Sequence, residues 1–122
     1  MKKKVNILGT TYAVRKISPG EDVYMSKMHF GGVCDGGTKT ITIINLKELP
    51  DFADEPKEVI VAKEKEILRH EIVHAFLNES GLEWNSSPVE IAWAKNEEMV
   101  DWFALQFPKI YKAYIEMDCV GV

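Results

Sequence analysis

The sequence predicts an α+β domain, in which a small antiparallel or mixed β-sheet is followed by helices. Short alternating segments fill the first 46 residues, and helical periodicity begins only at Pro56. Strands that come first and helices that come second are typical of this fold class. A chain of 122 residues is long enough to bury a hydrophobic core without disulfide or metal staples. We therefore expect one domain that spans residues 1–122.

Four strands are predicted from alternating side chains and from the turn residues between them. The predicted strands are Val5–Leu8, Tyr12–Ile17, Met28–Cys34 and Thr38–Leu46. The last two form a predicted hairpin, since Asp35, Gly36 and Gly37 between them favour a turn. Gly31 and Gly32 inside its first arm indicate a bulge or a close approach to another part of the chain.

A long helix is predicted from Pro56 to Ser80, with its clearest periodicity between Lys63 and Asn78. Proline suits a helix start, and Gly81 suits a left-handed stop.

A second helix is predicted from Ser87 to Phe107. Ser87 and Glu90 form a capping box, with Pro88 at the first helical position. Pro108 is expected to interrupt this helix, and Lys109–Met117 is predicted as a separate short helix.

Charge and composition exclude several classes of protein. The net charge of −4 argues against a general nucleic-acid-binding protein. The two cysteines are too few for a disulfide framework, and no secretory signal follows the opening lysines. The longest apolar run is far too short to cross a membrane. We expect a soluble, cytoplasmic protein with no membrane partner.

The segment His70-Glu71-Ile72-Val73-His74 predicts a zinc site. Residues four apart on a helix project from one face, so both imidazoles can reach one Zn²⁺ at about 2.0–2.1 Å. Glu71 lies beside them and can accept a proton from a water molecule at the metal. The bland alternative is a buried helix whose histidines make ordinary hydrogen bonds. The apolar surroundings favour the metal, because a buried polar group without a partner is costly.

A third ligand is expected on the second predicted helix. A helical wheel places Glu97 at the edge of an apolar arc that includes Trp93 and Val100. Asp101, one turn later, shares that edge and is expected to accept a hydrogen bond from a ligand imidazole. Glu98 points toward solvent on the same wheel. Glu97 is therefore the better ligand, with Glu98 as the alternative.

These motifs resemble those of the gluzincin metallopeptidases of the thermolysin type. Their second motif is Asn-Glu-x-x-x-Asp, and Asn96, Glu97 and Asp101 match it position for position. The small size and the strands ahead of the first motif look more like the minimal ImmA/IrrE-like peptidases of phages and mobile elements. This resemblance implies a zincin-like fold, with zinc bound by His70, His74 and Glu97. It also implies Glu71 as general base.

One feature departs from that family. ImmA/IrrE-like sequences place the ligand glutamate four residues before a Phe-Ala pair, and the corresponding residue here is Met99. Thioether sulfur cannot replace a carboxylate ligand. Either the helix register differs from that of the family by one or two residues, or Glu98 is the third ligand.

Several other residues are candidates without a spacing argument. His29, Tyr111 and Tyr114 are possible oxyanion-stabilising residues, but a local hydrogen bond or interior packing is the simpler expectation. Cys34 is expected to be a small buried hydrophobic residue. The three tryptophans are expected either in the core or in a hydrophobic groove; they are Trp84, Trp93 and Trp102.

The expected function is hydrolysis of a peptide or protein substrate by a zinc metallopeptidase. The resemblance implies a regulatory protein such as a phage repressor as substrate, with Thr38–Ile44 running beside the peptide. The first alternative is a non-catalytic zincin-like module that binds a partner protein. The second is a phage structural protein that binds no metal.

Overall fold

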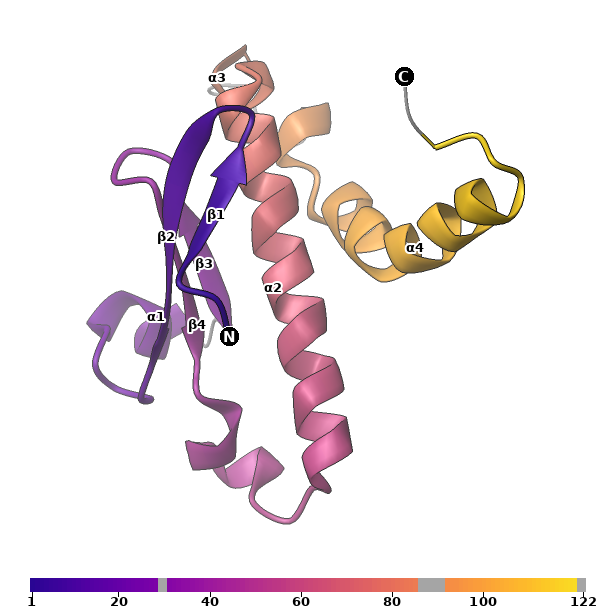
Figure 1. Ribbon diagram of the computed structural model, residues 1–122. Coiled ribbons are helices and arrows are strands. Elements are labelled where there is room, and N and C mark those ends of the chain that lie inside the picture. Colours follow the sequence, from indigo (N-terminus) through magenta and orange to yellow (C-terminus); the bar gives the residue numbers. More distant parts are fainter. Residues whose placement is uncertain (29–30, 86–91, 121–122) are drawn as a thin grey trace.

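The computed structural model describes residues 1–28, 31–85 and 92–120. The strands are β1 (Lys4–Ile7), β2 (Thr10–Ile17), β3 (Gly32–Asp35) and β4 (Thr40–Ile44). The α-helices are α1 (Val23–Met28), α2 (Lys57–Glu79), α3 (Leu82–Asn85) and α4 (Glu97–Glu116), and 3-10 turns occur at Leu46–Glu48, Pro50–Phe52 and Trp93–Lys95. The predicted α+β class is confirmed: a four-stranded mixed sheet precedes two long helices (Figure 1). Within the described residues, no helix is both long and apolar enough to span a membrane.

The sheet has the strand order β1-β2-β4-β3. β1 pairs antiparallel with β2, β2 pairs parallel with β4, and β3 pairs antiparallel with β4. β4 is therefore an internal strand, and β3 lies at an edge. The expectation that Thr38–Ile44 runs beside a substrate is wrong, because both neighbours of that strand belong to the sheet itself.

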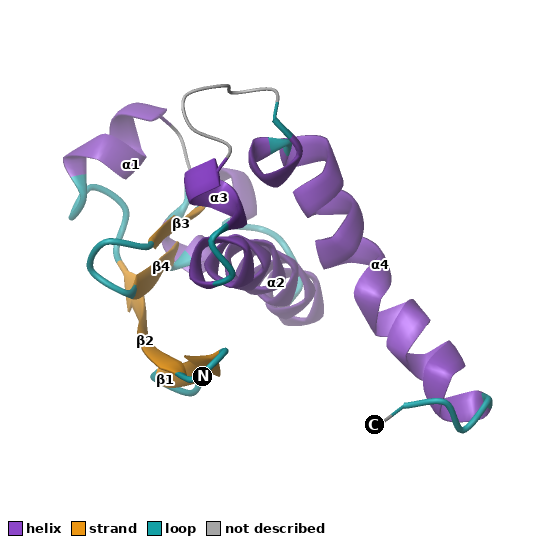
Figure 2. Cartoon of the chain, turned by 90° about the horizontal axis from the view of Figure 1, so that it is seen from above, coloured by secondary structure: helices purple, strands orange, loops and turns teal. Residues whose placement is uncertain are grey.

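α2 crosses one face of the sheet and forms the main core with it (Figure 2). Alternation along the strands turns Tyr12, Val14, Ile41 and Ile43 toward this face, where α2 supplies Ala75. The opposite face carries Ile17 and Ile44, which α1 covers with Met25. α2 thus covers one face of the sheet, whereas α1 covers only the ends of β2 and β4 on the other face, where Ala13 and Arg15 stay exposed.

Met28–Cys34 was predicted as a strand, but Met28 is the last residue of α1. The side-chain Oδ1 of Asp22 accepts a hydrogen bond from the backbone N–H of Met25 at 3.0 Å. This is the capping interaction that starts a helix, and Met25 is 1% exposed. The cap and the buried methionine favour helix where the sequence pattern indicated the beginning of a strand.

α2 begins and ends within one residue of the prediction. Its N-cap is Pro56, and Gly81 follows its end with φ +83°. Glycine adopts this left-handed conformation without the steric penalty of a β-carbon. The predicted stop at Gly81 is confirmed.

The second predicted helix begins later than expected. Its capping box, Ser87–Glu90, lies outside the described residues. Ala92 and Asn96 are extended, and a 3-10 turn separates them. The side-chain Oδ1 of Asn96 accepts from the N–H of Met99 at 2.9 Å, so Asn96 is the N-cap of α4 and Glu97 its first residue.

Pro108 does not end this helix, which continues to Glu116. The predicted separate helix Lys109–Met117 is therefore the second half of α4. Proline leaves the carbonyl four residues earlier, that of Ala104, without its usual N–H donor. The Nε of Arg69 on α2 donates to this oxygen at 2.6 Å. A partner from outside the helix thus satisfies the acceptor that proline leaves free.

Candidate metal centre

α2 carries His70 and His74 on the same side, as their spacing predicts. Their Nε2 atoms are 3.1 Å apart, and their ring centroids are separated by 4.8 Å. Both side chains are about one-fifth exposed, at 21% and 18%. The two rings therefore converge at a partly shielded point beside the helix.

Glu97 brings a carboxylate to the same point from the first turn of α4. Its Oε2 lies 3.1 Å from Nε2 of His70, and its Oε1 lies 3.3 Å from Nε2 of His74. Among the described residues, these three side chains form a group that could hold a metal ion. Glu98, the alternative ligand, is exposed and does not belong to this group.

The spacing of the group is compatible with a shared metal ion. Bonds of about 2.0–2.1 Å at tetrahedral angles place neighbouring ligand atoms about 3.3–3.4 Å apart. The Nε2 of His70 lies 3.1 Å from both the Nε2 of His74 and the Oε2 of Glu97, whereas His74 contacts the other carboxylate oxygen, Oε1, at 3.3 Å. With one ligand atom from each residue, the three atoms lie within 4.8 Å of one another. Two imidazoles and one carboxylate form a donor set that suits zinc among other divalent ions.

Asp101 orients the ring of His70. Its Oδ1 lies 2.6 Å from the Nδ1 of His70. An ionised carboxylate only accepts hydrogen bonds, so the Nδ1 of His70 carries the proton. The Nε2 of a neutral His70 then presents a lone pair toward Glu97 and His74, as a metal ligand must. This is the arrangement expected for Asp101 from its position one turn after Glu97.

The environment of His74 also favours the ligand form. Burial lowers the pKa of His74 and exceeds the opposing effect of the Glu97 charge. The nearby His70 acts in the same direction as burial. His74 is therefore biased toward the neutral imidazole, the form that binds a metal.

Glu71 lies in the same cleft and is 6% exposed. Burial raises its pKa to about 7, while the His70 charge opposes that shift. The backbone N–H of Cys34 donates a hydrogen bond to its carboxylate. A carboxyl group with a pKa near neutrality, fixed by a strand backbone, is suited to exchange protons with a neighbouring molecule.

These residues line a cleft of about 960 Å³ between β3, α2 and the start of α4. Its floor at the metal centre comes from α2, and its wall comes from the edge strand through Gly31, Gly32, Val33 and Cys34. Gly32 allows the close approach of the two elements, because a β-carbon there would lie 2.7 Å from Cγ2 of Ile67. The predicted close approach at this glycine pair is confirmed.

The helical wheel from which Glu97 was predicted wrongly included Trp93 in the apolar face of the helix. Trp93 lies outside α4 and is 56% exposed, so it does not belong to the apolar face of that helix. Val100 and Ala104 form that face instead, and Val100 packs with Leu77 of α2. Their burial against α2 sets the rotation of α4 and brings Glu97 to the histidines.

Three features of the site escaped the sequence reasoning. Arg69 of α2 donates a hydrogen bond to the Ala104 carbonyl of α4. Pro108 could have indicated this contact, because a proline inside a helix leaves the carbonyl four residues earlier without its N–H donor. Glu83 lines the cleft beside His74; its position follows from the turn at Gly81 and has no motif. The N–H of Cys34 is a backbone group, which residue type cannot reveal.

The other sequence candidates do not belong to the metal-binding group. His29 is outside the described residues, as is the side chain of Trp84. Tyr111 and Tyr114 are exposed beyond Pro108, so the expectation of interior packing is wrong for both. Trp93 and Trp102 are more than half exposed, which excludes them from the core. Cys34 is half-buried against the main core, and burial raises the pKa of its thiol to about 12.

Comparison of the chain with protein-family models, with curated proteins and with solved structures found no match.

Proposed function

We propose that this protein is a zinc-dependent peptidase with the minimal zincin-like arrangement implied by its motifs. One observation carries the proposal: ligand atoms of His70, His74 and Glu97 lie within 4.8 Å of one another, with Glu71 in the same cleft. The contact between Asp101 and His70 adds support, because ligand imidazoles commonly donate their other N–H to a carboxylate. A purely structural site is typically closed by four protein ligands, whereas three leave a position for catalysis.

The residues of the chain would divide the work as follows. Zinc, when bound, supplies a Lewis acid and lowers the pKa of water. Glu71 accepts a proton from the attacking water and delivers it to the leaving amine of the cleaved peptide bond. Burial raises its pKa to about 7 in the metal-free protein, and the charge of a bound cation would lower the pKa from there. The Cys34 N–H holds the carboxylate in place, and Asp101 keeps His70 in its ligand tautomer.

The edge strand β3 supports a peptide as substrate. The N–H of Ile44 bonds to the carbonyl of Gly31, which fixes the alternation of the β3–β4 ladder. Gly32 therefore directs both of its backbone groups away from β4, toward the cleft. Cys34 does the same with its carbonyl, because its N–H already bonds to Glu71. An extended peptide can add to such an edge by main-chain hydrogen bonds. This replaces Thr38–Ile44, the strand expected from the family resemblance.

The substitution Glu71→Gln tests catalysis against the alternative of a non-catalytic partner-binding module. It preserves the size of the side chain but removes the proton acceptor. We expect zinc content to stay unchanged and cleavage of an unstructured protein such as casein to fall by about 10²–10⁴-fold. Glu98→Gln, at an exposed position outside the metal group, is the matched control and should retain activity.

Zinc binding without cleavage of any peptide or protein tested would favour the partner-binding module. Cleavage that survives Glu71→Gln would contradict the role given to Glu71. Neither outcome contradicts metal binding by the site, so the experiment tests catalysis separately from metal binding.

A further inference from the structure

Pro108 leaves one carbonyl of α4 without its N–H donor, and Arg69 of α2 supplies a donor in its place. Proline has no backbone N–H, so the Ala104 carbonyl loses its donor within the helix. The Nε of Arg69 donates to that oxygen at 2.6 Å, while Ala104 itself is 2% exposed. A shielded carbonyl of this kind needs a donor, because water reaches it poorly.

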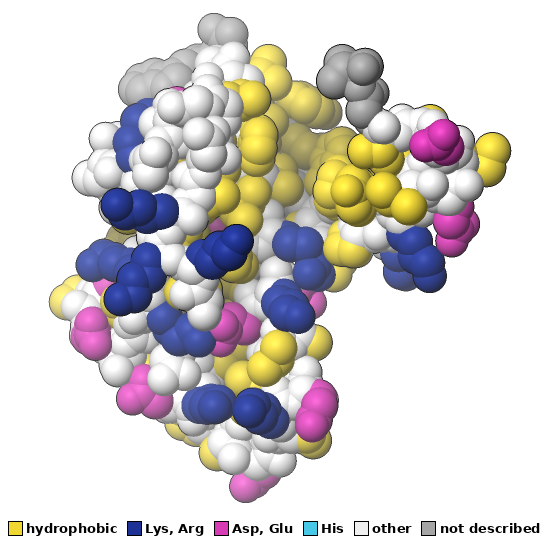
Figure 3. All heavy atoms as spheres, in the orientation of Figure 1, with side chains coloured by type: hydrophobic (Ala, Val, Ile, Leu, Met, Phe, Trp, Pro, Cys, Tyr) yellow, Lys and Arg dark blue, Asp and Glu magenta, His cyan; other side chains and the backbone are white. Residues whose placement is uncertain are grey.

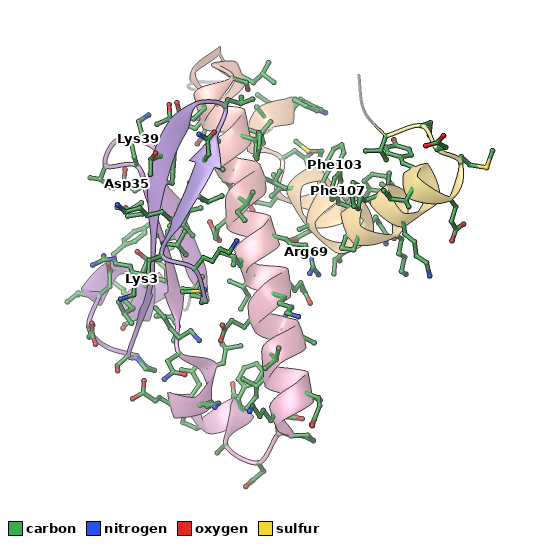
Figure 4. The ribbon with its side chains drawn as sticks, viewed as in Figure 1. Lys3, Asp35, Lys39, Arg69, Phe103 and Phe107 are labelled. Carbon is green, nitrogen blue, oxygen red and sulfur yellow. The ribbon has the colours of Figure 1, made fainter. Side chains whose placement is uncertain are left out.

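This contact lies directly beside the metal centre. Arg69 immediately precedes His70, and Ala104 lies one helical turn after Asp101, the partner of His70. The two helices are thus joined by neighbouring contacts, Arg69 to Ala104 and His70 to Asp101, each of 2.6 Å. Figure 4 shows Arg69 on the side of α2 that faces α4.

Among the residues that the structure describes, few buried contacts hold the outer part of α4. Its residues from 111 onward are exposed, and Glu97 at its other end is itself 64% exposed on its side chain. The buried contacts of this helix with α2 centre on Val100 and Ala104. A directional bond at Ala104 therefore limits both the rotation and the tilt of the helix that carries the third ligand.

We propose that Arg69 is a positioning residue for the metal centre. It replaces the helix bond that Pro108 removes and so fixes α4 where Glu97 reaches both histidines. The inference rests on the proposed metal site and adds a residue that touches neither the metal nor the substrate. Arg69 is required in this role because residue 108 is proline, which leaves the Ala104 carbonyl without a donor from the helix.

The test is a double-mutant cycle that compares the unmodified protein, Arg69→Met, Pro108→Ala and the double variant. Methionine keeps an apolar stem and removes the donor, while alanine at position 108 restores an N–H to Ala104. Zinc affinity is measured by competition with a chromophoric chelator. We expect Arg69→Met alone to weaken zinc binding about tenfold, because the shielded Ala104 carbonyl is then left without a donor in the arrangement of α4 that binds the metal.

In the Pro108→Ala background, the same Arg69→Met change should weaken binding less than about threefold, because the carbonyl no longer depends on arginine. The absorption spectrum of the Co²⁺-loaded proteins gives a second readout, since it reports ligand geometry. The spectrum of Arg69→Met should be altered, and Pro108→Ala should restore it. Lys65→Met, one turn earlier at an exposed position of α2, controls for loss of a positive charge.

Equal losses in both backgrounds would overturn the inference, as would unchanged zinc affinity in Arg69→Met. If Arg69→Met folds only together with Pro108→Ala, that rescue supports the inference; failure to fold in both backgrounds overturns it. Failure of the unmodified protein to bind zinc would instead overturn the proposed function. Amide exchange in α4 of the four zinc-free proteins would then still test the coupling between Arg69 and Pro108.

Discussion

Gly32 sits where β3 comes closest to α2, and its missing side chain sets the width of the cleft. An added β-carbon would lie 2.7 Å from Cγ2 of Ile67 and 3.0 Å from Cγ of Glu71. Both atoms are near the helix backbone and have little freedom to move. We expect Gly32→Ala to lower the free energy of unfolding by about 1–3 kcal/mol. Denaturant unfolding followed by circular dichroism measures this change.

Gly31→Ala is the matched control for that prediction. Its β-carbon would meet Cδ1 of Ile67 at 3.1 Å, the flexible end of the side chain. The cost should therefore be clearly smaller. Equal effects of the two substitutions would contradict the close packing assigned to Gly32.

Glu79 makes the stability of the fold dependent on pH. Its carboxylate accepts hydrogen bonds from Lys39 at 2.6 Å, Tyr12 at 2.7 Å and Thr10 at 3.0 Å. These bonds, with that from Lys39 the largest influence, lower the Glu79 pKa from 4.5 to about 2. A pKa depressed by folding stabilises the folded state above pH 4.5, and this stabilisation disappears as the pH falls toward 2.

The corresponding test is unfolding by denaturant at a series of pH values. Stability should fall between pH 4.5 and 2, and Glu79→Gln should remove part of that dependence. Glu58→Gln, in the exposed first turn of α2, is the control and should leave the acid profile unchanged. An acid profile that Glu79→Gln does not alter would show that this network does not link protonation to folding.

At the scale of the element, α4 depends on the cap that starts it. Asn96 accepts from the N–H of Met99 and thereby fixes Glu97 as the first helical residue. We expect Asn96→Ala to cost about 0.5–2 kcal/mol of stability, because the N–H of Met99 loses its acceptor. Zinc binding should weaken as well, since fraying of this turn releases Glu97. Thermal unfolding and zinc competition measure the two effects.

Asn96→Asp keeps a capping oxygen and is the control for that substitution. It should retain both stability and zinc affinity. Loss of zinc affinity in Asn96→Asp as large as in Asn96→Ala would show that the amide acts by a route other than capping.

The elements also show where sequence reasoning succeeds and fails. The bounds of α2 were predictable within one residue, because Pro56 and Gly81 are local signals. The His70–His74 spacing was equally local, and it places both rings on one side of that helix. The predicted start of α4 was wrong because Asn96, which is its N-cap, was interpreted as a residue inside the helix. Within α4, the carbonyl that Pro108 leaves without a donor bonds to Arg69, which is distant in sequence, so local patterns could not predict that contact.

At the scale of the whole molecule, the fold class was predictable but the strand order was not. Alternation identifies strands, whereas the parallel pairing of β2 with β4 depends on contacts across intervening chain. That pairing decides that β3, rather than β4, is the edge strand beside the cleft. The sequence pattern therefore predicted the strands, but the strand expected beside a substrate, Thr38–Ile44, is internal where the sheet has its edge at β3.

The apolar surface of α4 is a second global property that periodicity did not resolve. Phe103 and Phe107 are exposed at 37% and 50%, and Figure 3 shows hydrophobic side chains gathered on α4 and on the part of α2 beside it. An amphipathic pattern indicates an apolar face, but it does not say whether another element covers that face.

The metal site proposed between α2 and α4 is tested most directly by the zinc stoichiometry of the protein. Elemental analysis should find about one zinc ion per chain in the unmodified protein and in Glu98→Gln. His74→Ala should abolish binding, and Glu97→Gln should reduce it strongly, while both remain folded by circular dichroism. Absence of zinc from the unmodified protein after incubation with the ion, or full zinc content in His74→Ala and Glu97→Gln, would contradict the account.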